Sequence, residues 1–243
     1  MKTYAIGDIH GHLDLLQNVH SWIAADIAQH GPATVVHIGD LVDRGANSSG
    51  VIDFLMNGIA EGQDWVVLKG NHDRMFSYFL DDPDSQDPCL REGLGYLHPK
   101  IGGAATLASY GVRNPQDRPV APVYAEAVEA VPIAHRDFLL NLPISFQRDE
   151  AFFCHAGIRP GVALDDQIED DLTWIRHEFL DDTRDHGKLI VHGHTAIAKP
   201  TLYKNRLNVD SSAAYGGPLS VVALEGRRVF HLLDGIRHEL FPE

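Results

Sequence analysis

Short apolar runs alternate with helical patterns along the first eighty residues, and this order restricts the fold more than any other feature of the chain. Buried strands are expected at residues 3–7, 33–39 and 64–69, and helices at 13–29, 50–60 and 73–80. A β-α-β-α-β-α order predicts a sheet with helices packed on its faces.

The pattern changes at residue 81. Residues 81–91 are expected to form an acidic excursion on the surface, and helical patterning returns near 102–110 and at 123–141. An acidic helix is expected at 165–181, and strands at 144–148, 151–154, 188–192, 206–209, 219–224 and 228–233. Because no repeat or linker interrupts these segments, we expect residues 1–243 to form a single catalytic α/β domain.

Composition excludes several classes of partner. The 243 residues include 34 acids and 20 Lys or Arg, a net charge of −14. Binding to a phosphate backbone or an anionic membrane needs clusters of basic residues, so we expect neither nucleic acid nor membrane as a partner. No leader or long apolar span is evident, which predicts a cytoplasmic protein.

Ionisable and amide side chains gather at the ends of the expected strands, bordered by glycines. The segments are GDIHG at 7–11, GDLVDRG at 39–45, GNHD at 70–73, HAG at 155–157 and GHT at 193–195. Ligands of α/β sheets bind beyond the carboxyl ends of the strands, so we expect these segments to meet at one rim. Any one of them alone would be an ordinary turn or a core histidine. Together, at successive strand ends, they predict a functional site.

The residue types at this rim suit divalent metal ions. Histidines without cysteine, combined with carboxylate and amide oxygens, are typical of Mn, Fe or Zn in a catalytic site rather than of a closed structural zinc site. The two predicted ligand sets share one residue: the first is Asp8, His10 and Asp40, and the second is Asp40, Asn71, His155 and His194. Asp40 would then bridge the two ions of a dinuclear centre.

The motifs GDIHG, GDLVDRG and GNHD resemble those of the calcineurin-like metallophosphoesterases, and most closely those of its bacterial and phage-type phosphoprotein phosphatases. The segments 155–157, 174–176 and 193–195 fit later blocks of that branch, and Ala196 stands where many phosphodiesterase relatives carry a second histidine. Two positions depart from the pattern. Asp73 replaces the Glu of the eukaryotic enzymes, and Asp-Ser-Ser-Ala at 210–213 replaces Asp-Thr-Gly-Ala.

The resemblance covers essentially the whole chain and implies a metallophosphoesterase fold: a central β-sandwich flanked by helices, with the dimetal site at the C-terminal ends of the strands. It implies a hydrolase similar to serine/threonine protein phosphatases. Such an enzyme would cleave phosphorylated Ser, Thr or Tyr side chains by attack of a metal-bridging hydroxide. Mn²⁺ is the expected ion, with Fe or Zn as alternatives. The expected partner is a phosphoprotein or a small phosphorylated substrate.

The same resemblance implies roles for four further residues. His72 would be the general acid, and Asp43 would hold its ring and stabilise the protonated form. Arg44 and Arg176 would clamp the phosphate, because a planar guanidinium matches two phosphoryl oxygens. The plainer alternatives are an Asp43–Arg44 ion pair and, for Arg176, a solvated helix position beside Glu178.

Two other functions fit the sequence. A symmetrical bis(5′-nucleosyl)-tetraphosphatase, which hydrolyses dinucleoside polyphosphates, shares the first three motifs. A non-catalytic metal-binding scaffold could keep the fold, but it should lack a ligand or His72, and none of these residues is missing.

Overall fold

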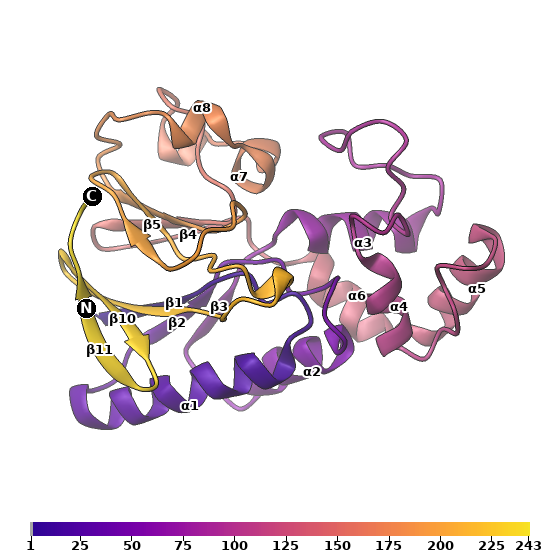
Figure 1. The fold of residues 1–243 in the computed structure, drawn as a ribbon, viewed down its shortest axis with the longest axis horizontal. Helices are drawn as coiled ribbons and strands as arrows, with labels where there is room; N and C mark the ends of the chain where they lie inside the picture. The colour runs from indigo at the N-terminus through magenta and orange to yellow at the C-terminus, as the bar shows by residue number, and fades with distance from the viewer. Residues whose placement is uncertain (1) are drawn as a thin grey trace.

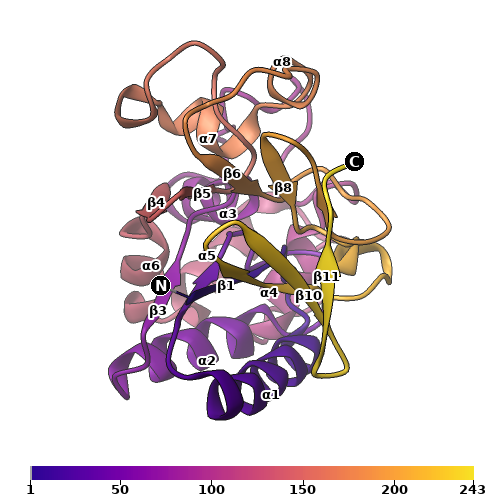
Figure 2. The same cartoon turned by 90° about the vertical axis from the view of Figure 1, so that its left-hand side faces the viewer.

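The computed structural model describes residues 2–243 and shows two β-sheets packed face to face, with helices on both outer sides (Figures 1 and 2). The predicted sandwich is therefore present. A lobe of helices, coloured from purple to pink in Figure 1, extends from one end of the two sheets, and both termini lie at the opposite end.

The first sheet combines the N- and C-terminal parts of the chain in the order β11-β10-β9-β1-β2-β3. Its strands are β1 (Lys2–Ile6), β2 (Thr34–His37), β3 (Trp65–Val67), β9 (Val221–Glu225), β10 (Arg228–Leu233) and β11 (Ile236–Leu240). Strands β1, β2 and β3 are parallel, and β9 pairs antiparallel with β1. The carboxyl ends of β1, β2 and β3 consequently point to the same edge.

The second sheet has the order β4-β5-β6-β8-β7. Its strands are β4 (Ser145–Arg148), β5 (Ala151–Cys154), β6 (Leu189–His192), β7 (Thr201–Leu202) and β8 (Arg206–Asn208). Because β5, β6 and β8 are parallel, this sheet also delivers several strand ends to one edge.

Helices cover the outer faces. Next to the first sheet lie α1 (Leu13–His30) and α2 (Ser48–Ala60), and above the second lie α7 (Glu169–Trp174) and α8 (His177–Leu180) (Figure 1). The helical lobe consists of α3 (Asn71–Asp81), α4 (Gly103–Ser109), α5 (Val120–Ala130) and α6 (Ile133–Leu140). Short 3₁₀ turns occur at η1 (Leu164–Asp166) and η2 (Ala213–Tyr215). In residues 2–243, none of the helices combines the length and the apolar character that crossing a membrane requires.

Strand periodicity explains how one strand serves two apolar layers. Successive side chains of β1 point to opposite faces, so Tyr4 and Ile6 pack with the helices while Ala5 packs between the sheets. In β2, Val35 and Val36 divide in the same way. Strands β1 and β2, buried on both faces, thus read as continuous apolar runs, which is why they were recognisable in the sequence.

The structure corrects three secondary-structure predictions. The expected helix at 123–141 divides at Pro132, because the residue before a proline is disfavoured in the helical region and Val131 is extended. The expected helix at 165–181 begins with η1 and breaks between α7 and α8, where Arg176 leaves the helical conformation with φ −133° and ψ −100°. Strands β7 and β11 were not anticipated.

Candidate active site

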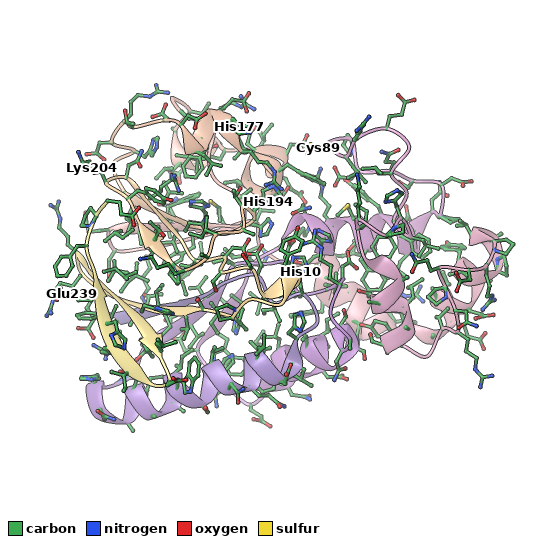
Figure 3. The ribbon with its side chains drawn as sticks, viewed as in Figure 1. His10, Cys89, His177, His194, Lys204 and Glu239 are labelled. Atoms are coloured by element: carbon green, nitrogen blue, oxygen red, sulfur yellow. The ribbon has the colours of Figure 1, made fainter. Side chains whose placement is uncertain are left out.

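The five glycine-bordered segments follow β1, β2, β3, β5 and β6, and the structure brings them together around a cavity of about 240 Å³. Eight of the ten predicted site residues line this cavity, while Asp43 and His155 are fully buried. Figure 3 shows His10 and His194, which are far apart in the sequence, close together at this edge of the two sheets.

Asp40 lies at the centre of the cluster. Its Oδ2 is 3.3 Å from His10 Nε2, and its Oδ1 is 3.3 Å from His155 Nε2. Oδ1 also accepts a hydrogen bond from the backbone N–H of His72 at 3.0 Å. Burial alone would raise the pKa of Asp40, but the nearby histidines, His155 first, hold that pKa well below its usual range. The two oxygens of the Asp40 carboxylate therefore face different histidines, Oδ2 facing His10 and Oδ1 facing His155.

Backbone carbonyls orient two of these imidazoles. His10 Nδ1 lies 2.9 Å from the Val42 carbonyl oxygen, and His155 Nδ1 lies 3.0 Å from that of Ile38. A carbonyl can only accept, so in the neutral ring each Nδ1 carries the proton and each Nε2 keeps a lone pair that could bind a cation next to Asp40. This arrangement is typical of histidines that bind metals through the other nitrogen.

Asn71 joins the second group from the first turn of α3. Its Oδ1 lies 2.9 Å from His194 Nδ1 and 3.0 Å from His155 Nε2. These three residues come from the ends of β3, β5 and β6, so the second predicted ligand set converges as the strand order implies.

Asp8 lies beside a third buried carboxylate, Asp210. Burial raises the pKa of Asp8 well above its usual range, and repulsion by Asp210 and Asp40 adds to this. Burial likewise raises the pKa of Asp210. Asp8 Oδ2 accepts a hydrogen bond from the backbone N–H of His194 at 3.0 Å, which joins the end of β1 to the end of β6. Bound cations would relieve the repulsion among these acids.

The donor set fits divalent metals. One potential ligand atom from each of His10, Asp40 and His72 lies within 4.8 Å of the others, and the same holds for Asp40, His155 and His194. His194 takes part through Nδ1, the ring nitrogen that faces Asn71 Oδ1. The first of these groups contains His72, where the sequence analysis placed Asp8.

Asp43 and His72 form a buried pair. His72 Nδ1 lies 2.7 Å from Asp43 Oδ2. The other oxygen of Asp43 accepts hydrogen bonds from Tyr96 Oη at 2.6 Å and Thr106 Oγ1 at 2.8 Å. Both oxygens of the Asp43 carboxylate are therefore hydrogen-bonded, and His72 is held with Nε2 toward the cavity.

The two arginines enter the cavity from different elements. Arg44 makes no ion pair with Asp43 but directs Nη2 at His72 Nε2, 3.0 Å away. Arg176 lies in the break between α7 and α8, where it is exposed and its Nη1 donates to Thr195 Oγ1 at 3.3 Å. Arg176 is solvated, as the plainer alternative expected, but it is not helical and it lines the cavity.

Backbone strain concentrates at the site. Five site residues have positive φ: His10, Asp40, Asp43, Arg44 and His194, with values from 45° to 73°. Such conformations are uncommon outside glycine and persist where surrounding contacts enforce them. Close approach matters as well. A Cβ on Gly70 would lie 2.2 Å from Asp40 Oδ1, and one on Gly193 would lie 2.1 Å from Asp8 Oδ1.

A family model described as calcineurin-like phosphoesterase matches residues 1–223. The chain belongs to this family. Calcineurin-like phosphoesterases use a dimetal centre, in agreement with the ligand groups found here. The predicted hydrolase class and the predicted family fold are both confirmed. The choice of Mn²⁺ stays a prediction that rests on the types of ligand.

Curated relatives of this phosphoesterase carry the name bis(5′-nucleosyl)-tetraphosphatase PrpE, asymmetrical. The protein from Bacillus mycoides (strain KBAB4) is 24% identical over 241 residues, covering 90% of this chain and 89% of that protein. The protein from Bacillus thuringiensis (strain Al Hakam) is 24% identical over 243 residues, covering 91% and 90%.

Solved structures show the same fold. A candidate diadenosine tetraphosphatase superposes with a TM-score of 0.64 at 21% identity, covering 99% of this phosphoesterase and 94% of that chain. A cold-active protein-tyrosine phosphatase from a psychrophilic Shewanella species gives 0.62 at 17% identity, covering 99% and 80%. At these identities the likeness concerns the fold alone.

The predicted specificity for phosphorylated protein side chains is wrong. Relatives spanning nine-tenths of the phosphoesterase are named tetraphosphatases, which favours the alternative instead, although in an asymmetrical rather than a symmetrical form. The reason is physical. The motifs supply metal ligands and phosphate contacts, and these are needed whatever the leaving group is, so they do not specify the rest of the substrate.

Sequence reasoning missed several residues that shape the site. Tyr96 and Thr106 lie in a region without a recognisable motif, and only the folded chain places them on Asp43.

The acidic excursion at 81–91 is held to the helical lobe by a buried ion pair. Asp87 is buried and accepts two hydrogen bonds from Arg74, at 2.6 and 2.7 Å. The run of acids concealed this buried ion pair.

Proposed function

We propose that the chain hydrolyses dinucleoside tetraphosphates, in the asymmetrical mode that gives a nucleoside triphosphate and a nucleoside monophosphate. The observation that carries this proposal is the tetraphosphatase name of relatives that match along almost the whole chain. The cavity is compatible with it, because buried metal-binding groups and two arginines converge on a space suited to phosphates. Residues from Asp8 to Asp210 contribute, so the entire chain would act as one catalytic domain.

The metal ligands in this proposal are Asp8, His10, Asp40, Asn71, His155 and His194. Their mixed oxygen and imidazole donors suit Mn²⁺, with Fe or Zn as alternatives. When bound, two such ions would supply Lewis acidity toward a phosphoryl group and would lower the pKa of water. Asp40 would be shared, because its two oxygens face separate histidine groups.

His72 would hold and deliver a proton at Nε2, which faces the cavity. Its Nδ1–H is directed at Asp43 Oδ2, so a second proton on the ring would be stabilised by a carboxylate fixed from behind by Tyr96 and Thr106. Asp43 is thus proposed as a positioning residue that sets the tautomer and ring orientation of His72.

Arg44 and Arg176 would bind the polyphosphate. The protein carries a net charge of −14, so an anionic substrate is repelled at long range and needs local cations. Both guanidiniums line the cavity, and Arg44 already contacts His72. Replacing that contact by a phosphoryl oxygen would place the substrate next to the proton donor.

The test is an assay of purified protein with Mn²⁺ and diadenosine tetraphosphate, with products separated by chromatography. We expect ATP and AMP in equal amounts and loss of turnover after exhaustive chelation. The His72→Asn variant serves as the control for contaminating phosphatases. Cleavage of a phosphoserine peptide with no turnover of the dinucleotide would overturn the proposal, and two molecules of ADP would overturn the asymmetrical mode.

A further inference from the structure

Tyr215 presents an exposed aromatic ring at the mouth of the cavity. Its side chain is 70% exposed, yet it lines the same cavity as the predicted metal ligands. No other Tyr, Phe or Trp among the described residues lines this cavity. A large ring left in water beside a polar site is a feature to explain, because exposing it forgoes the gain from burial.

The ring is exposed, but hydrogen bonds hold its backbone in place. Tyr215 ends the 3₁₀ turn η2, which lies between left-handed residues at Ser212 (φ 70°) and Gly216 (φ 85°). The backbone N–H groups of Tyr215 and Gly217 both donate to the Ser212 carbonyl at 2.9 Å, and the Ser212 hydroxyl donates to the Ile197 carbonyl at 2.8 Å. A binding surface that is already ordered loses little entropy when a ligand arrives.

The size of the cavity determines where a nucleoside can lie. About 240 Å³ is below the roughly 300–1,000 Å³ typical of pockets that enclose a small organic ligand. Phosphates fit among the charged groups, but the ribose and base of a dinucleotide must extend past the rim. Tyr215 is the aromatic residue at that rim.

Arg44 connects the ring to the phosphate position. The Arg44 guanidinium carbon lies 4.9 Å from the centre of the Tyr215 ring, and the same side chain reaches His72 within the cavity. In a nucleotide only one ribose separates the base from its nearest phosphate. A phosphate held by Arg44 would therefore bring a base within reach of the ring.

We propose that Tyr215 is a stacking platform for a nucleobase of the substrate. This inference rests on the proposed function, and it adds a specificity-determining residue to it. Every base offers a flat π face, so such a platform selects nucleotides over other phosphates without choosing among bases. The competing explanation is that Tyr215 supports Arg44 by a cation–π contact, in which case it would affect all phosphates equally.

The decisive comparison uses two ligands that differ only by the base, AMP and ribose 5-phosphate. Their dissociation constants are measured by calorimetry on the Mn²⁺-equilibrated wild type and on the Tyr215→Ala and Tyr215→Phe variants. Tyr203→Ala is the matched control, because that ring also lies over an arginine, with Arg206 Cζ 3.6 Å from its centre, but it lines a different cavity.

We expect the wild type to prefer AMP by roughly 5- to 150-fold, the equivalent of about 1–3 kcal/mol per stacked base. Tyr215→Ala should abolish the preference, whereas Tyr215→Phe and Tyr203→Ala should retain it. Equal weakening of both ligands in Tyr215→Ala would assign the ring to Arg44 and overturn the platform. A wild type without preference, or an alanine variant that keeps it, would also overturn it.

A hydrolysis assay distinguishes failure of the stacking proposal from failure of the proposed tetraphosphatase function. Hydrolysis of diadenosine tetraphosphate is compared with hydrolysis of inorganic tripolyphosphate, which has no base. The platform predicts that Tyr215→Ala raises the KM ratio of dinucleotide to tripolyphosphate. If the wild type does not hydrolyse the dinucleotide but prefers AMP through the ring, the proposed function fails and the base subsite stands.

Discussion

Acid should destabilise this protein through two histidines in contact between α1 and β2, of which His37 is fully buried and His20 is partly buried. His37 of β2 is fully buried, and its Nε2 lies 3.0 Å from Nε2 of His20 on α1. Phe54 and Trp65 enclose His20, with ring centres 5.1 and 4.4 Å away. Burial lowers the pKa of His20 from its ordinary 6.5 to about 4.

The magnitude follows from these two pKa values. The folded and unfolded states therefore differ roughly 300-fold in the proton affinity of His20, which corresponds to about 3 kcal/mol. The folded-state pKa is the lower one, so the unfolded chain binds the proton more readily. The contribution of His20 is fully present above pH 6.5 and is lost as the pH falls toward 4.

Urea denaturation between pH 7 and pH 4, with a chelator present, measures the effect. His20→Gln removes the titration but keeps a hydrogen-bonding side chain toward His37. The free energy of unfolding of the wild type should fall by about 3 kcal/mol more than that of the variant across this range. Parallel curves for the two proteins would refute the assignment of a neutral His20 in the folded protein.

Three substitutions test the site itself. Asp40→Asn should cost both metal ions in elemental analysis, because a neutral amide bridges two cations poorly; one tightly retained ion with normal turnover would exclude the bridge. His72→Asn should leave both ions bound and slow hydrolysis by roughly 10²–10⁴-fold. The defect should be larger on an alkyl phosphate such as phosphoserine than on the dinucleotide, whose nucleotide leaving group needs less protonation. Equal losses on the two substrates would contradict the acid role. Gly70→Ala places a Cβ 2.2 Å from the Asp40 backbone nitrogen and should lower metal content, and a variant with full metal content would show that the loop can yield.

The strand ends were predictable because the chemistry of the site is local in sequence. Each proposed ligand lies within a few residues of an apolar run, and parallel strands carry those ends to one edge whatever the details of the loops. The positions of Asp8, Asp40 and Asn71 therefore followed from the strand order. Their detailed geometry did not, since the sharing of Asp40 between two histidine groups depends on a left-handed backbone at that residue.

Residues that act across long separations in sequence could not be predicted. Tyr96 and Thr106 meet Asp43 only because the segment that follows α3 packs against the loop after β2. Arg74 and Asp87 form a buried pair whose acid looked like part of a solvated run. Tyr215 was hidden for a different reason, because an exposed ring in a glycine-flanked turn has no periodic signal.

A competition between two substrates decides between a dinucleoside tetraphosphatase and a protein phosphatase. Diadenosine tetraphosphate and a phosphoserine peptide are mixed at equal concentration with the Mn²⁺-loaded protein, and both are followed in one reaction, so that their rates report the ratio of the two kcat/KM values. We expect the dinucleotide to be consumed first, with ATP and AMP as products. Consumption of the phosphopeptide while the dinucleotide stays intact would contradict it.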